Sequence, residues 1–348
     1  MARKLILSDH PEEVRKLTES YIQSGNLNFL FGSGASMPAI KVAGNIEAEI
    51  NSLLIGGNTA DANLMAFEFI EELAEASVDL LIEVDEPSVK RTLDNYVDFL
   101  SILDGILFER KNILLPRQAN LFTTNYDLFF EKAASKLPRV TMNDGFDRTS
   151  AVDSRYVFAA EKYFDRTYRS GISNDRLAEL PILNLIKVHG SLSWTRYNDK
   201  EIRFNDDNFA LSGHVQKNNP GEVSKALAKR AVILPNIRKF ESTLMERVYF
   251  DLLRLFSNSM EKDNSLLICF GFSFGDEHIL DITKRALRNP TAQLIIFAYS
   301  DTDANSFEDK FCQHRNVVVI DPGSGKRIDF STFNSILREV GPAGGKPQ

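Results

Sequence analysis

Cysteine is scarce in this chain of 348 residues, which has only two, Cys269 and Cys312. Two cysteines so far apart cannot supply a four-cysteine zinc site or a disulfide framework. Long apolar runs are also absent, since none approaches the roughly 18 residues that a membrane-spanning helix needs. The N-terminus turns polar directly after Leu5 to Leu7. We therefore expect no signal peptide, no membrane segment, and a soluble cytoplasmic protein with reduced thiols.

An excess of basic charge is absent too. The chain has 41 Lys and Arg against 48 Asp and Glu, which gives a net charge of −7. This balance argues weakly against a dedicated nucleic-acid-binding surface, with a local basic patch as the alternative, and we expect no direct sequence-specific binding of nucleic acid. The hydrophobic share of 43% excludes a fibrous or wholly disordered protein. At about 150 residues per domain, the length allows one large or two modest domains.

What the chain does contain is a series of short apolar runs that alternate with helical patterns. A helix is predicted over residues 11–23. Buried strands are predicted at residues 26–31, 120–123, 181–188, 231–234, 265–270, 293–297 and 317–320. Continuous apolar runs are typical of parallel strands that are covered on both faces. The pattern therefore predicts an α/β fold with a doubly wound, mostly parallel, Rossmann-like sheet.

We divide the chain into an N-terminal helix (1–25), one main domain (26–335), and a C-terminal end with a flexible tail (336–348). The main domain is predicted to hold a helical insert at about 46–112 and a variable insert at about 136–180. Within the helical insert, Ala66 to Glu86 contains eight carboxylates and no Lys or Arg. A solvated helix face is the plainer interpretation, and a docking face for a basic partner is the alternative.

Ligands of an open α/β sheet bind beyond the carboxyl ends of its strands, and four predicted strand ends carry unusual sequence. Small residues from Gly32 to Ser36 follow the first strand, where backbone N–H groups could approach a pyrophosphate. A plain tight turn is the alternative. Polar residues from Thr123 to Asp127 follow the second strand, and Thr124 or Asn125 could simply cap the next helix.

The third strand end carries His189, followed by Gly190. A histidine at this position is placed for proton transfer near neutral pH, although a lone histidine is often a satisfied structural residue. At the fourth end, Gly271 and Ser273 could meet a phosphate or a ribose hydroxyl. Asp276 is predicted to cap the helix that follows.

Together and in this order, the four strand ends resemble the sirtuin-like superfamily, which binds NAD. Its Gly-Ala-Gly-x-Ser loop is matched by Gly32 to Ser36, with Ser33 in place of alanine. Its Thr-x-Asn-x-Asp, His-Gly and Gly-x-Ser elements are matched at 123–127, 189–190 and 271–273. The chain is most similar to the divergent bacterial branch in which Thr-Thr-Asn-Tyr-Asp, Lys-x-His-Gly-Ser and Gly-x-Ser-Phe-x-Asp recur together.

The resemblance implies a site and a substrate, NAD. Asn125 would orient the ribose hydroxyls or the attacking water, and His189 would be the general base. Asp127 would position Asn125 or bind the nicotinamide amide. The residues implied to bind the rest of NAD are Gly32, Ser33, Gly34, Ala35, Ser36, Thr124, Gly271 and Ser273. No metal is needed for this chemistry.

The activity implied is hydrolysis of NAD at the nicotinamide–ribose bond, giving nicotinamide and ADP-ribose. The divergent branch further implies an NAD-depleting effector of bacterial anti-phage defence that acts by abortive infection. Its expected partners are other copies of the chain, as a homo-oligomer, and a HerA-type hexameric ATPase or helicase. The alternatives are an NAD-dependent protein lysine deacylase and a non-catalytic sensor of NAD or ADP-ribose.

Two departures from the family bear on these alternatives. The loop after Ser36 lacks the arginine that sirtuins usually carry, and Lys41 is the replacement considered, although a point charge does not reproduce a bidentate fork. Deacetylating sirtuins generally hold a zinc module with four cysteines, which two cysteines cannot form. The cysteine count therefore favours a metal-free NADase.

Overall fold

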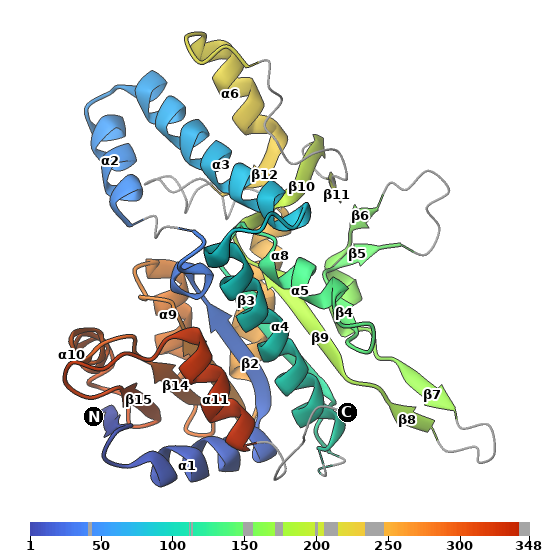
Figure 1. The fold of residues 1–348 in the computed structure, drawn as a ribbon, viewed down its shortest axis with the longest axis vertical. Helices are drawn as coiled ribbons and strands as arrows, with labels where there is room; N and C mark the ends of the chain where they lie inside the picture. The colour runs from blue at the N-terminus through green and yellow to red at the C-terminus, as the bar shows by residue number, and fades with distance from the viewer. Residues whose placement is uncertain are drawn as a thin grey trace.

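The computed structural model describes residues 1–40, 44–110, 112, 114–148, 156–170, 177–198, 201–204, 215–233 and 247–340. Its centre is an eight-stranded sheet in the order β1-β15-β14-β13-β2-β3-β9-β4, with every neighbouring pair parallel (Figure 1). The strands are β1 (Arg3–Ile6), β2 (Asn26–Phe31), β3 (Gln118–Thr123), β4 (Met142–Asn143), β9 (Ile182–Lys187), β13 (Ser265–Phe270), β14 (Gln293–Phe297) and β15 (Val317–Asp321).

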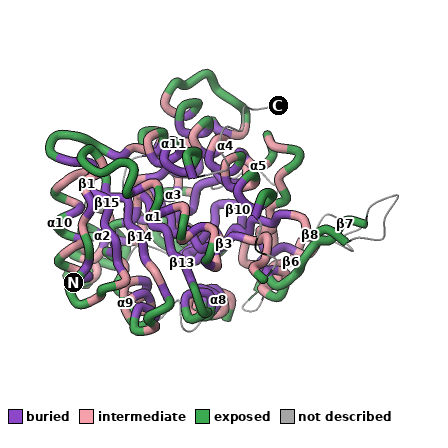
Figure 2. The backbone as a smooth tube through the Cα atoms, turned by 90° about the horizontal axis from the view of Figure 1, so that it is seen from below, coloured by how far each residue is buried: buried purple, intermediate pink, exposed green. Residues whose placement is uncertain are grey.

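Helices cover both faces of this sheet. One face carries α1 (Pro11–Ser24), α4 (Pro87–Phe108), α5 (Phe129–Ser135) and α11 (Phe330–Val340), and the other carries α8 (Arg247–Glu261), α9 (Glu277–Ala286) and α10 (Asp301–Lys310). Because side chains alternate across a strand, Phe29 and Phe31 of β2 join the first core and Leu30 joins the second. Figure 2 shows the buried strands enclosed between the helices. The prediction of a doubly wound, mostly parallel α/β fold is confirmed.

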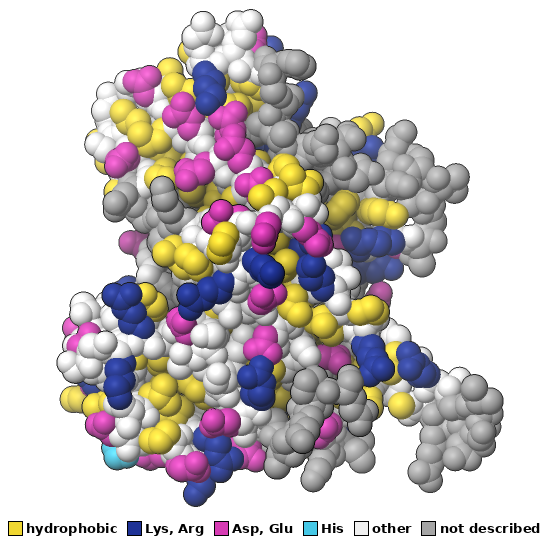
Figure 3. All heavy atoms as spheres, viewed as in Figure 1, with side chains coloured by type: hydrophobic (Ala, Val, Ile, Leu, Met, Phe, Trp, Pro, Cys, Tyr) yellow, Lys and Arg dark blue, Asp and Glu magenta, His cyan; other side chains and the backbone are white. Residues whose placement is uncertain are grey.

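A helical segment separates β2 from β3. It contains α2 (Gly44–Ile55), α3 (Thr59–Leu81) and α4. In Figure 1, α2 and α3 lie beyond the carboxyl ends of the strands, together with α6 (Pro220–Lys229). The apolar stripe of α3 is buried, and acidic side chains gather on its outer surface (Figure 3). Lys217 forms ion pairs with Glu68 and Glu71 there. Such a solvated acidic face matches the plainer of the two interpretations of this run.

A second, antiparallel sheet has the order β12-β10-β11-β6-β5. Its strands are β5 (Phe146–Asp147), β6 (Val157–Phe158), β10 (Gly190–Asn198), β11 (Glu201–Phe204) and β12 (Arg230–Val232). The strand predicted at 231–234 is therefore part of this sheet and not of the main one. The reason is a reversal at Gly190, whose φ of +86° turns the chain so that β10 pairs with β12. In the core of this sheet, Phe146 packs edge to face against Phe158 and Trp194, and the rings of Phe158 and Trp194 are tilted by 44° to each other.

The segment around residues 136–180 contributes to three places. Besides β4, β5 and β6 it forms a short 3₁₀ helix, η2 (Ala160–Phe164), and a hairpin of β7 (Tyr168–Ser170) with β8 (Leu177–Glu179) that projects from the body in Figure 1. None of the described helices is both long and apolar enough to cross a membrane. Lys41 and the predicted tail after residue 340 fall outside the described residues.

Candidate active site

The four strand ends singled out in the sequence leave the sheet at one level. Phe270 of β13 pairs with Phe31 of β2, Phe31 pairs with Thr123 of β3, and Thr123 pairs with Lys187 of β9. The segments that follow are therefore neighbours along one edge of the sheet. The chain order also reverses between β2 and β13, which is the switch point where ligands of such sheets bind.

The first and fourth segments meet through glycines. The N–H of Gly34 donates to the carbonyl oxygen of Gly271 at 3.0 Å. A Cβ added to Gly32 would lie 2.5 Å from that same oxygen, and one added to Gly271 would lie 2.5 Å from the backbone nitrogen of Ala35. Packing alone therefore requires Gly32 and Gly271. The outer surface of the 3₁₀ helix η1 (Ser33–Ser36) consists of the partly exposed Ser33 and Gly34, so a pyrophosphate would meet little more than backbone there.

A buried network of hydrogen bonds holds the side chain of Asn125 in place. Its side-chain nitrogen donates to the carbonyl oxygen of Gly32 at 3.0 Å and to Oγ of Ser36 at 3.1 Å. Ser36 in turn donates to Oδ2 of Asp127 at 2.6 Å. The geometry thus favours the positioning role for Asp127, with Ser36 between it and Asn125. Ser36 is predicted to hold the pyrophosphate, but its hydroxyl points inward in this structure.

Neither Thr124 nor Asn125 caps the following helix. The helix α5 begins at Phe129, its N-cap position is Leu128, and no side chain caps it there. Asp127 instead accepts a hydrogen bond from the backbone N–H of Phe129 at 3.2 Å, so the polar residues form a loop before the helix. The capping alternative left open by the sequence is wrong.

His189 is paired with a carboxylate. Its Nε2 lies 3.1 Å from Oδ2 of Asp276, and both side chains are only 9% exposed. The other oxygen, Oδ1, accepts from the backbone N–H groups of His278 and Ile279, so Asp276 caps α9 as predicted. The helix end therefore fixes the carboxylate, and the carboxylate orients the imidazole ring.

Sequence reasoning placed Asp276 only as a helix cap. The signal that marked it was the Gly-x-Ser-Phe-x-Asp element, whose last residue pairs with the histidine of another strand end. Lys187, the last residue of β9, belongs to a quoted motif but was given no role from the sequence, and it is 2% exposed in the structure. The available signals were its place in the Lys-x-His-Gly-Ser element and at the end of a predicted buried strand.

Lys187 ties the second and third segments together. Its ammonium donates to the carbonyl oxygen of Asp127 and to Oγ of Ser191, and it forms an ion pair with Glu131 at 2.7 Å. Burial raises the pKa of the Glu131 carboxyl, and the nearby Lys187 opposes that shift. Since the loops of Asn125 and His189 both begin beside this cation, it holds them in fixed relation.

The remaining predicted site residues lie at the edge of this arrangement. Thr124 is half-buried, and its N–H donates to the carbonyl oxygen of Phe31 at 3.3 Å. Ala35 is buried in the core. Ser273 is exposed, and its carbonyl oxygen accepts from Lys310 at 2.7 Å. The roles of these three residues in binding NAD stay predictions, as do those of the other residues named for that role.

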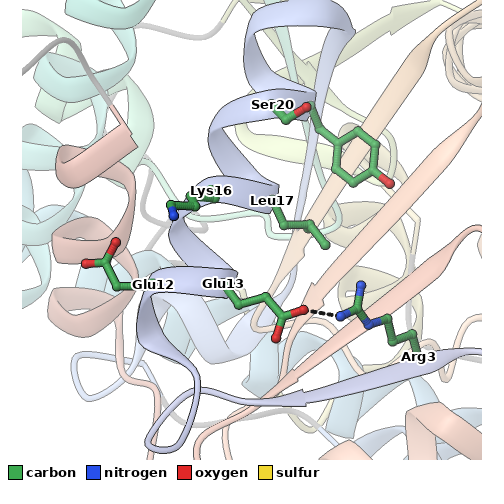
Figure 4. A pocket seen from close by; sticks show the side chains of 7 residues that line it. Arg3, Glu12, Glu13, Lys16, Leu17 and Ser20 are labelled. Carbon is green, nitrogen blue, oxygen red and sulfur yellow. Dashed lines mark hydrogen bonds and ion pairs between the residues drawn. The ribbon is translucent and has the colours of Figure 1, made fainter.

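A separate groove of about 630 Å³ lies between α1 and β1 (Figure 4). Arg3 and Glu13 form an ion pair across it. The lining residues are Arg3, Glu12, Glu13, Lys16, Leu17, Ser20 and Tyr21. None of them belongs to the four strand-end segments, so the groove is not part of the candidate site.

Within the described ranges, no group of three or more His, Cys, Asp or Glu side chains is placed to hold a metal ion. Cys269 is buried in β13, and Cys312 is exposed just after α10. The two thiols are therefore held apart on different elements.

Comparison with known families matches residues 119–320 to a model described as SIR2-like domain. No curated protein matches the chain. The matched span begins in β3 and ends in β15, and so contains Asn125, His189 and Gly271. The segment Gly32 to Ser36 lies before it, but the structure joins this segment to Gly271.

Proposed function

Since the matched span covers more than half of it, the chain belongs to the SIR2-like domain family, whose domains use NAD as substrate, and we propose that it is an NAD+ hydrolase. The observation that carries this proposal is that two polar groups follow neighbouring strand ends along the same edge of the sheet. One is the pair of His189 with Asp276, and the other is Asn125 with its buried support. Together they supply a base and an oriented amide at the switch point of the sheet.

In the proposed reaction the bond between the ribose C1′ and the nicotinamide nitrogen breaks. Its electron pair goes to the pyridinium ring, which leaves as neutral nicotinamide, while positive charge develops on the ribose. Water then bonds to C1′, and His189 accepts a proton from that water or from a ribose hydroxyl. Such general base catalysis is typically worth about 10²–10⁴-fold in rate. Asp276 stabilises the protonated imidazole, and Asn125 orients the ribose hydroxyls or the water.

We extend the proposal to an NAD-depleting effector of anti-phage defence, on the strength of the three motifs that recur together in the divergent bacterial branch. An unregulated NADase would harm its own cell, so we expect activity to depend on assembly. The partners proposed are further copies of the chain and a HerA-type hexameric ATPase or helicase. Size measurement with and without the product of a neighbouring gene tests the partners, and phage infection with NAD quantification tests the role.

Product analysis tests the activity itself. Purified protein incubated with NAD and no peptide, both by itself and together with the product of the neighbouring gene, should release nicotinamide and ADP-ribose in equal amounts in its assembled state. Turnover that requires an acylated peptide would support a lysine deacylase, and saturable binding without turnover would support a sensor. Neither outcome is compatible with an NAD+ hydrolase.

Variants then test the assignment of residues. Asn125→Ala and His189→Ala should each lower turnover at least about 100-fold, in line with the loss of general base or orienting groups. His314→Ala, a histidine outside the four segments, serves as the matched control and should keep the wild-type rate. If both site variants consume NAD at the wild-type rate, the assigned site is wrong even though the activity stands.

A further inference from the structure

A tyrosine from the helical segment reaches the base of the candidate site. Tyr96 lies in the middle of α4 and is fully buried, with its hydroxyl 3.0 Å from Oγ of Ser36. Its ring stacks on Phe129 at 5.4 Å and meets Phe130 and Phe330 edge to face at 4.7 and 5.0 Å. These contacts hold the ring, and therefore the hydroxyl, in one place.

The Ser36 hydroxyl has a single hydrogen, and this determines which partner is the donor in each of its three hydrogen bonds. A serine hydroxyl has one hydrogen to donate and two lone pairs to accept with. Ser36 donates its hydrogen to Asp127, and one lone pair accepts from the amide nitrogen of Asn125. The second lone pair is left for Tyr96, so Tyr96 is the donor of that contact. Burial raises the pKa of the Tyr96 phenol well above its ordinary value, and the charge of Asp127 adds to this, so the hydroxyl keeps its proton.

The same count fixes the orientation of Asn125. Its amide nitrogen has two hydrogens, and these go to Oγ of Ser36 and to the carbonyl oxygen of Gly32. The opposite orientation would place the amide oxygen against the Gly32 oxygen, which brings two acceptors together. The part of the amide left for a substrate is therefore its carbonyl oxygen.

We propose that Tyr96 and Ser36 are positioning residues that lock Asn125 with its carbonyl oxygen toward the substrate. In this state Asn125 accepts a hydrogen from a ribose hydroxyl or from water and donates none. The identity of the substrate rests on the proposed function, whereas the orientation of the amide does not. It follows that α4 contributes a positioning residue to the site, in addition to packing against one face of the sheet.

Removing one hydroxyl tests the proposal. Tyr96→Phe keeps the aromatic packing and deletes only the donor to Ser36. Loss of one neutral hydrogen bond should lower kcat about 5-fold with little change in KM for NAD. Ser36→Ala should lower kcat at least about 10-fold, because it also leaves Asn125 and Asp127 without their shared partner. In the Ser36→Ala background, Tyr96→Phe should have no further effect on kcat.

Tyr163→Phe is the matched control. Tyr163 is also buried, and its hydroxyl donates to the carbonyl oxygen of Leu185 at 2.8 Å, away from the four segments. It should lower the thermal midpoint about as much as Tyr96→Phe while leaving kcat unchanged. Equal losses of kcat in the two tyrosine variants would overturn the proposal. So would an effect of Tyr96→Phe that is undiminished without the Ser36 hydroxyl.

A second measurement needs no turnover. In protein labelled with ¹⁵N-asparagine, the side-chain amide signal absent from Asn125→Ala identifies Asn125. Its hydrogens should exchange slowly in the wild type and at least about 10-fold faster in Ser36→Ala, since protection follows buried hydrogen bonding. Fast exchange in the wild type would overturn the orientation. Protected hydrogens in a protein that consumes no NAD, either by itself or with the neighbouring gene's product, would instead refute the proposed function and leave the orientation standing.

Discussion

The pair of His189 and Asp276 allows the sharpest prediction. Asp276→Asn keeps the size of the side chain and its cap on α9, because asparagine and aspartate are similar N-caps. With Oδ1 retained for the N–H groups of His278 and Ile279, the new amide nitrogen faces Nε2 of His189. An amide nitrogen can only donate, so Nε2 must become an acceptor and the ring proton must move to Nδ1. The nitrogen that would take up a proton in the reaction is then occupied.

The magnitude follows from the bond that is lost. A hydrogen bond to a charged group contributes about 1.5–3 kcal/mol. At about 1.4 kcal/mol per factor of ten, this gives a loss in kcat of about 10-fold to 100-fold. The reversed tautomer adds to this loss, and in the serine protease triad the same kind of substitution costs about 10⁴-fold. We therefore expect kcat to fall between about 10-fold and 10⁴-fold, with KM for NAD little changed.

The assay is nicotinamide release at saturating NAD, with thermal unfolding measured in parallel. Asp276→Ala should lose the same activity and, in addition, about 1 kcal/mol of stability through the lost cap. Ser300→Ala is the matched control, because Ser300 caps α10 by accepting from the N–H of Asp303. It should lose similar stability and keep its activity. Wild-type kcat in Asp276→Asn, or an equal loss in Ser300→Ala, would refute the role of the carboxylate.

Two further predictions concern stability. Lys187→Met removes a fully buried cation and leaves the partly buried carboxylate of Glu131 without its ion pair, so it should cost about 3 kcal/mol in urea unfolding. Glu131→Gln added to it should restore much of that loss, and a double variant as unstable as the single one would contradict the pairing. Gly271→Ala places a Cβ 2.5 Å from the nitrogen of Ala35 and should lower both thermal stability and NAD turnover. Gly325→Ala, with a similar positive φ but no heavy atom within 4 Å, should cost only about 1 kcal/mol, so equal effects would show that backbone strain alone matters.

Much of the main sheet was predictable from local pattern. The strands at 26–31, 265–270 and 293–297 match to the residue, because strands covered on both faces form continuous apolar runs. The second sheet was not predicted, since β5, β6 and β12 have only two or three residues each, and β12 pairs with a segment more than 30 residues away in the chain. The edge strand β1 is only four residues long, which is too short for any pattern.

Some features of the candidate site were likewise predictable from the sequence, and others were not. The residue types at the four strand ends pointed to one edge of the sheet, and the register of the strands brings them together there. The hydrogen-bond and ion-pair partners of these residues could not be predicted, because they depend on proximity in three dimensions and not on spacing in the sequence. Tyr96 is the clearest case: it stands in an apolar helical stripe, where an aromatic side chain predicts core packing and nothing more.

The hydrogen bond between Gly34 and Gly271 also has a consequence for the synthesis of the protein on the ribosome. Those two residues are 237 positions apart in the chain, and Asp276 follows His189 by 87. At about 5–20 residues per second, a ribosome needs at least about 4 seconds after His189 to add Asp276. Nascent chains and fragments that end between His189 and β13 contain Asn125 and His189, but they lack both Gly271 and the carboxylate of Asp276. If the chain is the proposed NAD-consuming enzyme, we therefore expect its unfinished copies to consume no NAD.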